Sequence, residues 1–542
     1  PLTYSGPQQP AVIGASIASA NFHLSYKIYE RQQLLSTKIK YCNEILKKHD
    51  LPTIKPSESP IFYIGLGLTK VGYNIVKRLL QEGVYVNLGI FPAVPETCTG
   101  VRFTLNHHHS FDDIKYLSEI LAFHLPKALE EENRTFHDIY RAFRSVTDLK
   151  YLIKLNERET VPNNSRFLLI HRKTINGIDK TLWNNLLGKN GSFDWNNLSI
   201  LENSFSDNEK QENNWEFHYY ILKDAKTHKP LIATFFTISL IKNDLLAPEN
   251  ISKNIEKSRL HDGYFLTSKC MMMGTLITEG QHIFIERKDP NWRPAFIYLL
   301  DNVWKEQEIQ KVPSLYLRDF PADDVELQEF LTDQGFVRIK MPNTHIIHDL
   351  SFNNVMDYLT TVGVKRRGHI KKDVLNLIDY FDVEIKTDLP MAEIDKLYQL
   401  YLNVSKKNFE INTFELPKLF FNNISRSPDW EIITLRIKKN YLCQSEDLTV
   451  AVVWAYKNEN YYPSVIGINY DYISHFKVYK QMLFRILERA IDLKCKKVYF
   501  GLTASLEKRK LGAIIKEQVA YIQHKDQFMM SMVEIEGNNI FK

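Results

Sequence analysis

Two neighbouring stretches early in the chain decide its fold: Phe91-Pro92-Ala93-Val94-Pro95 and Gly100-Val101-Arg102-Phe103-Thr104-Leu105-Asn106. The second stretch is rich in β-branched and aromatic residues, so it predicts a strand that carries Arg102. A helix is expected directly afterwards, because Ser110 can cap its first turn and Asp112 and Asp113 complement its positive end. The two stretches therefore predict a short strand that runs into a capped helix.

Around these stretches the chain resembles the C-terminal small domain of the α-oxoamine synthases, the pyridoxal-phosphate enzymes that include serine palmitoyltransferase and 8-amino-7-oxononanoate synthase. In that family Pro-x-Val-Pro, a glycine, an arginine within a short strand and a helix opened by an acidic pair follow in this order. The segment Tyr4-Ser5-Gly6-Pro7 resembles the start of that domain. The resemblance covers roughly residues 1–125. It implies pyridoxal phosphate as cofactor, an amino acid and an acyl-thioester as substrates, and a homodimer.

The resemblance assigns roles to two residues of this part. Arg102 would grip the carboxylate of the amino acid with two parallel hydrogen bonds, and the alternative is an ordinary ion pair on a surface strand. Ser5 would lie near the cofactor phosphate of the opposite subunit, and the alternative is an ordinary turn. The lysine that carries the cofactor belongs upstream of Pro1 in that family. We therefore expect a fragment or processed chain that cannot perform the condensation alone.

The other elements expected in this part form an α+β module. A long helix is predicted from Ala11 to His49, strands over 61–67 and 85–88, and a helix over 71–81 that Gly83 ends. Pro126 suits the first turn of a new helix, so residues 126–165 are a candidate helical connector.

The last part of the chain carries a second resemblance. A basic stretch from Lys365 to Lys372 precedes the strand Val498-Tyr499-Phe500-Gly501, and Lys508-Arg509-Lys510-Leu511-Gly512-Ala513 follows. This order is similar to the Fem-like branch of the GNAT-type acyltransferases, whose members place two such folds in tandem. The resemblance covers about residues 350–525, and the tandem plan extends it back to about 165. It implies transfer of an acyl group from a thioester or aminoacyl ester to an amine.

Lys508 is the residue predicted to contact the donor in that last part. We expect the donor, a coenzyme A thioester, within residues 350–525, where a helix N-terminus and Lys508 can meet a phosphate or a thioester carbonyl. The alternative makes Lys508 and Gly512 a turn with its solvated neighbour. The basic stretch could bind phosphates of a carrier, or it is a solvated helix face.

Polar residues cluster within apolar surroundings in the middle of the chain. Glu279 and His282 would share a helix face, although Gly274 and Gly280 favour a tight loop near a ligand. Arg318 and Asp319 end a predicted strand. One interpretation is a buried polar network between the two folds. The other places Glu279, His282 and Asp319 as catalytic candidates and Arg318 as a substrate-binding residue around an acyl-acceptor site.

Composition sets the remaining limits. The net charge of +5 does not demand a nucleic-acid partner. It is evidence against DNA as a partner and weaker evidence against tRNA as a donor. Five separated cysteines without a CxxC pair fit a reducing cytoplasm, and no apolar run reaches the length of a membrane span. The histidines His107, His108 and His109 are expected to be solvent-exposed, so no metal site is predicted.

The sequence thus predicts a multidomain protein of α/β and α+β class: an aminotransferase-type small domain at 1–125, a helical connector at 126–165 and two GNAT-like αβ folds at 166–348 and 349–542. The predicted function is an acyltransferase, part of a bifunctional enzyme of lipid biosynthesis that condenses an amino acid with an acyl-thioester and acylates an amine. Two alternatives stay open: a Fem-type transferase that uses aminoacyl-tRNA, and a non-catalytic dimerisation module beside a degenerate acyltransferase.

Overall fold

The computed structural model describes residues 9–91, 93–143, 166–442, 446–502 and 505–525. These residues form two compact units. Unit one contains the described residues within 1–161 together with 331–336 and Lys525, and unit two contains those within 162–330 and 337–524. Ser5 and the larger part of the predicted connector lie outside the described residues. The domain limits expected from the sequence stay a prediction.

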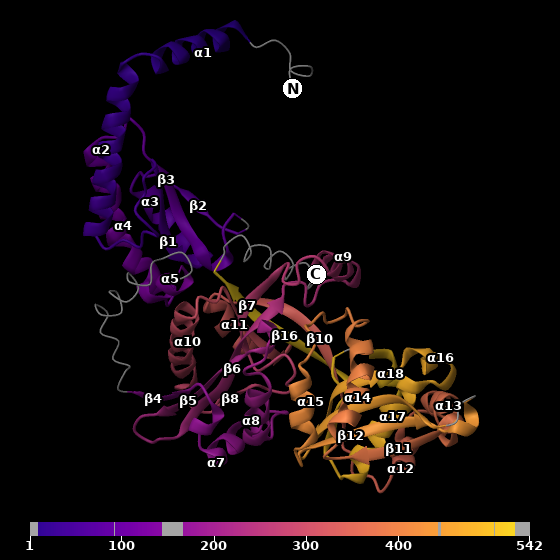
Figure 1. Ribbon diagram of the computed structural model, residues 1–542. Helices are drawn as coiled ribbons and strands as arrows, with labels where there is room; N and C mark the ends of the chain where they lie inside the picture. The colour runs from indigo at the N-terminus through magenta and orange to yellow at the C-terminus, as the bar shows by residue number, and fades with distance from the viewer. Residues whose placement is uncertain (1–8, 92, 144–165, 443–445, 503–504, 526–542) are drawn as a thin grey trace. The chain divides into compact units, whose positions relative to one another are not determined.

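Unit one is an α+β module built on a three-stranded antiparallel sheet in the order β1-β3-β2 (Figure 1). Apolar side chains of the sheet and of its helices, such as Ile64, Val101, Ile75 and Leu121, form one core. The predicted strands at 61–67 and 101–105 are confirmed. The elements are α1 (Pro10–His23), α2 (Lys27–Lys48), β1 (Ile61–Gly67), α3 (Thr69–Gln81), β2 (Asn87–Gly89), β3 (Thr99–Thr104), α4 (Phe111–Glu131) and α5 (Phe136–Ala142).

The helices of unit one differ from the prediction in two places. The single helix expected from Ala11 to His49 is divided between α1 and α2, and α1 buries no residue. The new helix expected at Pro126 is wrong, because Pro126 lies inside α4. Its ring removes one backbone donor, but burial of the neighbouring apolar side chains Leu125 and Leu129 holds the helix together across it. The predicted cap at Ser110 is confirmed as a capping box with Asp113.

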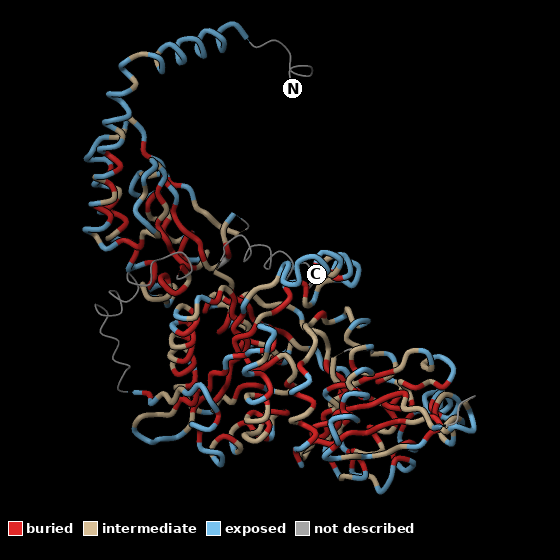
Figure 2. Tube along the Cα trace, viewed as in Figure 1, coloured by how far each residue is buried: buried red, intermediate tan, exposed pale blue. Residues whose placement is uncertain are grey.

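Unit two contains one mixed sheet of 13 strands, in the order β11-β12-β13-β14-β15-β10-β16-β9-β7-β6-β5-β4, with β8 paired to β6. Its strands are largely buried, and exposed residues concentrate on helices and loops (Figure 2). Within the described residues, no helix is long and apolar enough to cross a bilayer.

Two halves of unit two repeat one plan. In the first half β7 and β9 are parallel neighbours with α10 between them in the chain, and in the second half β14 and β15 are parallel neighbours with α17 between them. All other described pairs in this sheet are antiparallel. The C-terminal strand β16 pairs with β9 of the first half and with β10, so it joins the halves into one sheet.

The first half and β10 comprise β4 (Phe167–Arg172), α7 (Lys180–Trp183), α8 (Trp195–Ser204), β5 (Glu216–Asp224), β6 (Pro230–Lys242), α9 (Glu249–Arg259), β7 (Thr267–Met273), β8 (Ile283–Ile285), α10 (Trp292–Ile309), β9 (Ser314–Pro321), α11 (Val325–Asp333) and β10 (Val337–His348). The strands predicted at 219–222, 232–238 and 315–317 lie within β5, β6 and β9.

The second half and β16 comprise α12 (Val355–Thr361), α13 (Val364–Asp373), β11 (Phe381–Lys386), α14 (Met391–Ser405), α15 (Lys418–Ser425), β12 (Trp430–Ile437), β13 (Leu448–Lys457), β14 (Tyr461–Ile468), α16 (Ile473–Phe476), α17 (Val478–Asp492), β15 (Lys497–Tyr499), α18 (Ser505–Lys510) and β16 (Ile514–His524). The helices predicted at 394–404 and 478–493 are confirmed as α14 and α17.

Candidate active site

The candidate site of unit two begins where two parallel strands separate. β14 and β15 are paired only at Tyr461 and Val498. Beyond that pair a cavity of about 300 Å³ opens, lined by Val465 and Ile466 of β14 and by Gly501 after β15. Backbone groups along the diverging strands have lost the strand partner on that side, so a ligand can bind them there.

The cavity lining is apolar on one side and carries carboxylates elsewhere. Its apolar wall lies between β13, β14 and α17 and includes Val453, Leu483 and Ile486. Carboxylates occur elsewhere on the lining, among them Glu212 and Glu415. The cavity therefore offers both a lining for an apolar chain and acidic groups for a polar or cationic ligand.

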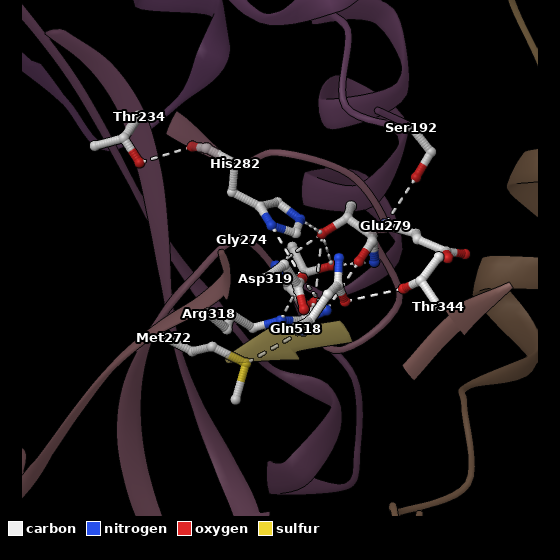
Figure 3. Close-up of polar contacts among 12 residues, drawn as sticks. Ser192, Thr234, Met272, Gly274, Glu279, His282, Arg318, Asp319, Thr344 and Gln518 are labelled. Carbon is white, nitrogen blue, oxygen red and sulfur yellow. Dashed lines mark hydrogen bonds and ion pairs between the residues drawn. The ribbon is translucent and has the colours of Figure 1, made fainter. Parts of the chain in front are cut away.

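A tight loop of the first half carries Glu279 to this cavity. Figure 3 shows Ser192 beside that loop. Gly274 and Gly280 have φ values of 77° and 132°, which favour glycine. The Glu279 backbone N–H donates to Ser192 Oγ at 3.2 Å, and its carbonyl accepts from the Ser192 N–H at 3.1 Å. The loop prediction is thus confirmed over the alternative of a helix face shared by Glu279 and His282.

Glu279 and Lys508 form the titratable centre of the cavity. A Cβ placed at Gly501 would lie 3.9 Å from Glu279 Oε2 and 4.0 Å from Lys508 Nζ, so both side chains end close to one point. Burial raises the pKa of Glu279 to about 7, although the nearby Lys508 charge opposes the shift. Burial lowers the pKa of Lys508 to about 8, and the Glu279 charge opposes that shift. Glu279 Oε1 is enclosed and has no hydrogen-bond partner among the described residues.

Three further sequence-predicted residues lie beside Glu279 as a buried network. His282 Nδ1 lies 3.2 Å from Asp319 Oδ2, and the Asp319 carboxylate also accepts from Arg318 Nε at 2.8 Å. Although burial alone would raise it, Arg318 and His282 hold the pKa of Asp319 below its usual value. Burial lowers the pKa of His282, which also contacts the Thr278 hydroxyl at 3.0 Å. Arg318 and Asp319 reach the cavity lining, whereas His282 lies behind it.

Arg318 fills the place in the first half that corresponds to the cavity. The parallel β7/β9 ladder ends at Met272 and Tyr316. Beyond it, Arg318 donates to the carbonyls of Thr275 at 2.7 Å and Thr278 at 3.1 Å. These charge-assisted bonds hold the loop that carries Glu279 beside the cavity, whose lining includes Thr278 and Arg318.

The sequence analysis missed several contributors to this site. Gln518 of β16 lines the cavity and accepts a hydrogen bond from the Thr344 hydroxyl of β10 at 2.9 Å (Figure 3). Gly501, which has a φ of 77°, was noted only as the end of a predicted strand. No local pattern marks these residues, because β10 and β16 become neighbours only in the folded sheet.

In unit one, Arg102 is exposed on β3, opposite Tyr63 of β1 and Asn87 of β2. Lys38 is the buried lysine of this unit's described part, and its Nζ donates to the carbonyls of His107 at 2.8 Å and His109 at 2.5 Å. With that amine already engaged, the described residues of unit one do not by themselves form a pyridoxal-phosphate site.

Comparisons with known proteins agree with the two resemblances. The chain is 32% identical over 119 residues to an 8-amino-7-oxononanoate synthase of Saccharophagus degradans, a match that covers 22% of this chain and 29% of that protein. The chain therefore spans less than a third of the length of this relative. The matched length agrees with the roughly 125 residues over which the family motif was found. No family model matches the chain.

Two solved structures are similar over a larger part of the chain. The crystal structure of FemX is 11% identical, with a TM-score of 0.45 over 66% of this chain and 98% of that one. A tandem GNAT protein from the clavulanic acid biosynthesis pathway is 9% identical, with a TM-score of 0.39 over 66% and 99%. At these values the similarity assigns no activity. The chain is thus similar over one part to an 8-amino-7-oxononanoate synthase and over another to FemX and a tandem GNAT protein.

Proposed function

We propose that unit two transfers an acyl group from a thioester to an amine in the cavity between β14 and β15. The observation that carries this proposal is the buried Glu279 carboxylate beside Lys508, at the point where the two strands separate. Its Oε1 has no hydrogen-bond partner among the described residues. A carboxylate with a pKa of about 7 is poised to accept a proton near neutral pH.

In the proposed reaction the amine attacks the thioester carbonyl while Glu279 takes its proton. The new C–N bond forms, the C–S bond breaks, and the thiolate leaves with the electron pair of that bond. Lys508, whose pKa of about 8 lies near that of a thiol, supplies a proton to the thiolate and is then reprotonated from Glu279. The products are an amide and a free thiol, and no proton is gained or lost overall.

A transfer assay with the whole chain tests this function. Coenzyme A thioesters of increasing chain length are mixed with a panel of amino acids and simple amines, and amide products are identified by mass spectrometry. We expect an amide with the wild-type chain and a strongly reduced yield with Glu279→Gln. Glu249→Gln, which makes the same change at a carboxylate of α9 outside the cavity lining, is the matched control. Equal yields from wild type and Glu279→Gln would overturn the assignment.

A second candidate donor, aminoacyl-tRNA, is favoured by one observation. The basic side chains of α13 are exposed: Lys365, Arg366, Arg367, Lys371 and Lys372. A row of exposed cations can contact phosphates of a nucleic acid. Transfer from charged tRNA, absent with coenzyme A thioesters and lost at high salt, would support this donor instead.

For unit one we propose the role of an oxoamine synthase small domain. Its support is the 32% identity over 119 residues together with the Pro-x-Val-Pro and Arg102 motif. Arg102 would bind the amino-acid carboxylate, and pyridoxal phosphate, when bound, would stabilise the carbanion formed from that amino acid. A homodimer, a place in lipid biosynthesis and a cytoplasmic location remain part of this proposal.

A further inference from the structure

A cluster of possible metal ligands lies in the first half of unit two, on the strands β4 and β5 and the helix α10. It consists of His171 on β4, His218 on β5 and Glu306 on α10, and one ligand atom from each lies within 4.8 Å of the others. His171 Nε2 lies 3.1 Å from His218 Nδ1, and His218 Nδ1 lies 3.9 Å from Glu306 Oε1. None of these three residues lines the proposed acylation cavity.

These separations fit one small cation. Zinc binds imidazole nitrogen and carboxylate oxygen at about 2.0–2.2 Å, so two ligands in a tetrahedral site lie about 3.3 Å apart. The two measured separations lie on either side of that value. The ligand atoms of all three residues lie within 4.8 Å of one another, so they converge on one region.

The burial of His218 also needs an explanation beyond packing. Its side chain is inaccessible to solvent, and its Nε2 has no hydrogen-bond partner among the described residues. A buried imidazole that is only half satisfied destabilises a core, where an apolar side chain would be tolerated better. Packing therefore does not account for a histidine at this position, and the other ring nitrogen, Nδ1, is the atom that faces His171 and Glu306.

The neighbouring groups decide what kind of ion can bind. His171 stacks on Tyr220 with ring centroids 4.4 Å apart, which holds its ring in place. Histidine has an ordinary pKa of about 6.5, so a neutral imidazole that keeps a lone pair for a metal is available at pH 7. Lys173 Nζ lies 2.8 Å from Glu306 Oε1, where it places a positive charge beside the carboxylate. Its side chain is more than half exposed, so it can move into solvent when an ion binds.

From this arrangement we infer that His171, His218 and Glu306 bind a divalent transition metal of the zinc class. Two imidazoles and one carboxylate are a ligand set that zinc favours, and the half-buried position of His171 leaves a fourth position for water. β4 is the edge strand of the large sheet, so the ion links that edge to β5 and α10. Its role is to stabilise the first half, separate from acyl transfer.

Zinc titration of the whole chain by calorimetry, after treatment with a chelator, tests the inference. We expect one equivalent to bind, and His171→Ala to weaken the Kd by more than the roughly 10–100-fold that loss of an outer-shell partner costs. Lys173→Met removes the competing cation, so it should tighten binding by about tenfold. A hydrogen-bonded network without a metal predicts no such gain.

Two controls separate this cluster from adventitious binding. His108→Ala removes the exposed histidine of the run at 107–109 and should leave the stoichiometry unchanged. His218→Ala should abolish binding, and if that variant does not fold, His171→Ala on the edge strand decides. Absence of zinc binding, or binding that is lost only in His108→Ala, would overturn the inference. Neither result bears on acyl transfer, which the product assay measures separately.

Discussion

Glu279 is the residue on which the proposed chemistry depends. Because burial raises its pKa to about 7, the proton-accepting form grows as the pH rises through 7. We predict that kcat/KM rises with pH up to about 7 in the wild-type chain. Glu279→Gln should lower kcat/KM by about 10²–10⁴ and abolish that rise. A pH profile from 5 to 10 checks this, and a rise that persists in Glu279→Gln would identify another base.

The same residue also predicts a pH-dependent stability. A carboxyl whose folded pKa lies above its unfolded value of 4.5 binds extra protons in the folded state between pH 4.5 and 7, so stability falls as the pH rises through that window. Glu279→Gln should remove this dependence, so its stability relative to wild type should improve by about 2 kcal/mol from pH 5 to pH 8. Urea unfolding at pH 5 and pH 8 measures the difference. A purely structural role predicts destabilisation at both values.

Two substitutions distinguish the two possible roles of Lys508, as a positive charge and as a proton donor. Its pKa of about 8 means that it loses its proton above pH 8, so we predict a fall in kcat/KM there. Lys508→Met removes both functions, whereas Lys508→Arg keeps the charge but cannot release a proton near neutral pH. If Lys508 protonates the thiolate, both variants lose about 10²-fold or more. Full activity in Lys508→Arg would reduce its role to a charge.

At the residue scale the sequence marked four residues that the structure places close together. Glu279, His282, Arg318 and Asp319 were recognised as polar residues in apolar surroundings, and the structure brings all four together. The sequence could not predict which of them reach the cavity, because that depends on burial in the folded chain, and His282 lies behind the lining. The partnership of Glu279 with Lys508 was also hidden, since the two residues come from different halves.

At the scale of elements, the proposed function makes the space between the diverging strands β14 and β15 the limit on the length of the acyl chain. Val465 lines the cavity on β14 and is 8% exposed. We predict that Val465→Phe extends a ring into the space for an apolar chain, so that kcat/KM falls for long acyl donors and is retained for acetyl-coenzyme A. A series of donors of increasing length measures this. An equal loss for every length would place the chain elsewhere.

The sequence could predict those elements whose determining residues lie close together in the chain. Ser110 and Asp113 form a cap within one turn, and the apolar face of 478–493 is complete in itself, so both helices were located. The insertion of β16 between β9 and β10 depends on pairing between distant segments, which no local pattern encodes. Pro126 misled the prediction because neighbouring buried side chains outweigh the single lost hydrogen bond.

At the scale of the whole molecule, the two units have separate cores. The core of unit one draws on residues 39–143, and the main cores of unit two draw on residues after 174. We predict two thermal transitions in calorimetry, of which an acyl-coenzyme A raises only the one that belongs to unit two. A ligand-induced shift of both transitions, or of neither, would contradict this assignment of the donor.

The central claim is that the donor binds where β14 and β15 separate. A crystal structure of the chain with an acyl-coenzyme A analogue, in which a methylene replaces the thioester sulfur, tests it most directly. The account predicts the ketone carbonyl of the analogue beside Gly501, with Glu279 facing the position from which an amine would attack. A carbonyl bound in the first half beside Arg318, or an analogue bound only at the surface of the chain, would contradict it.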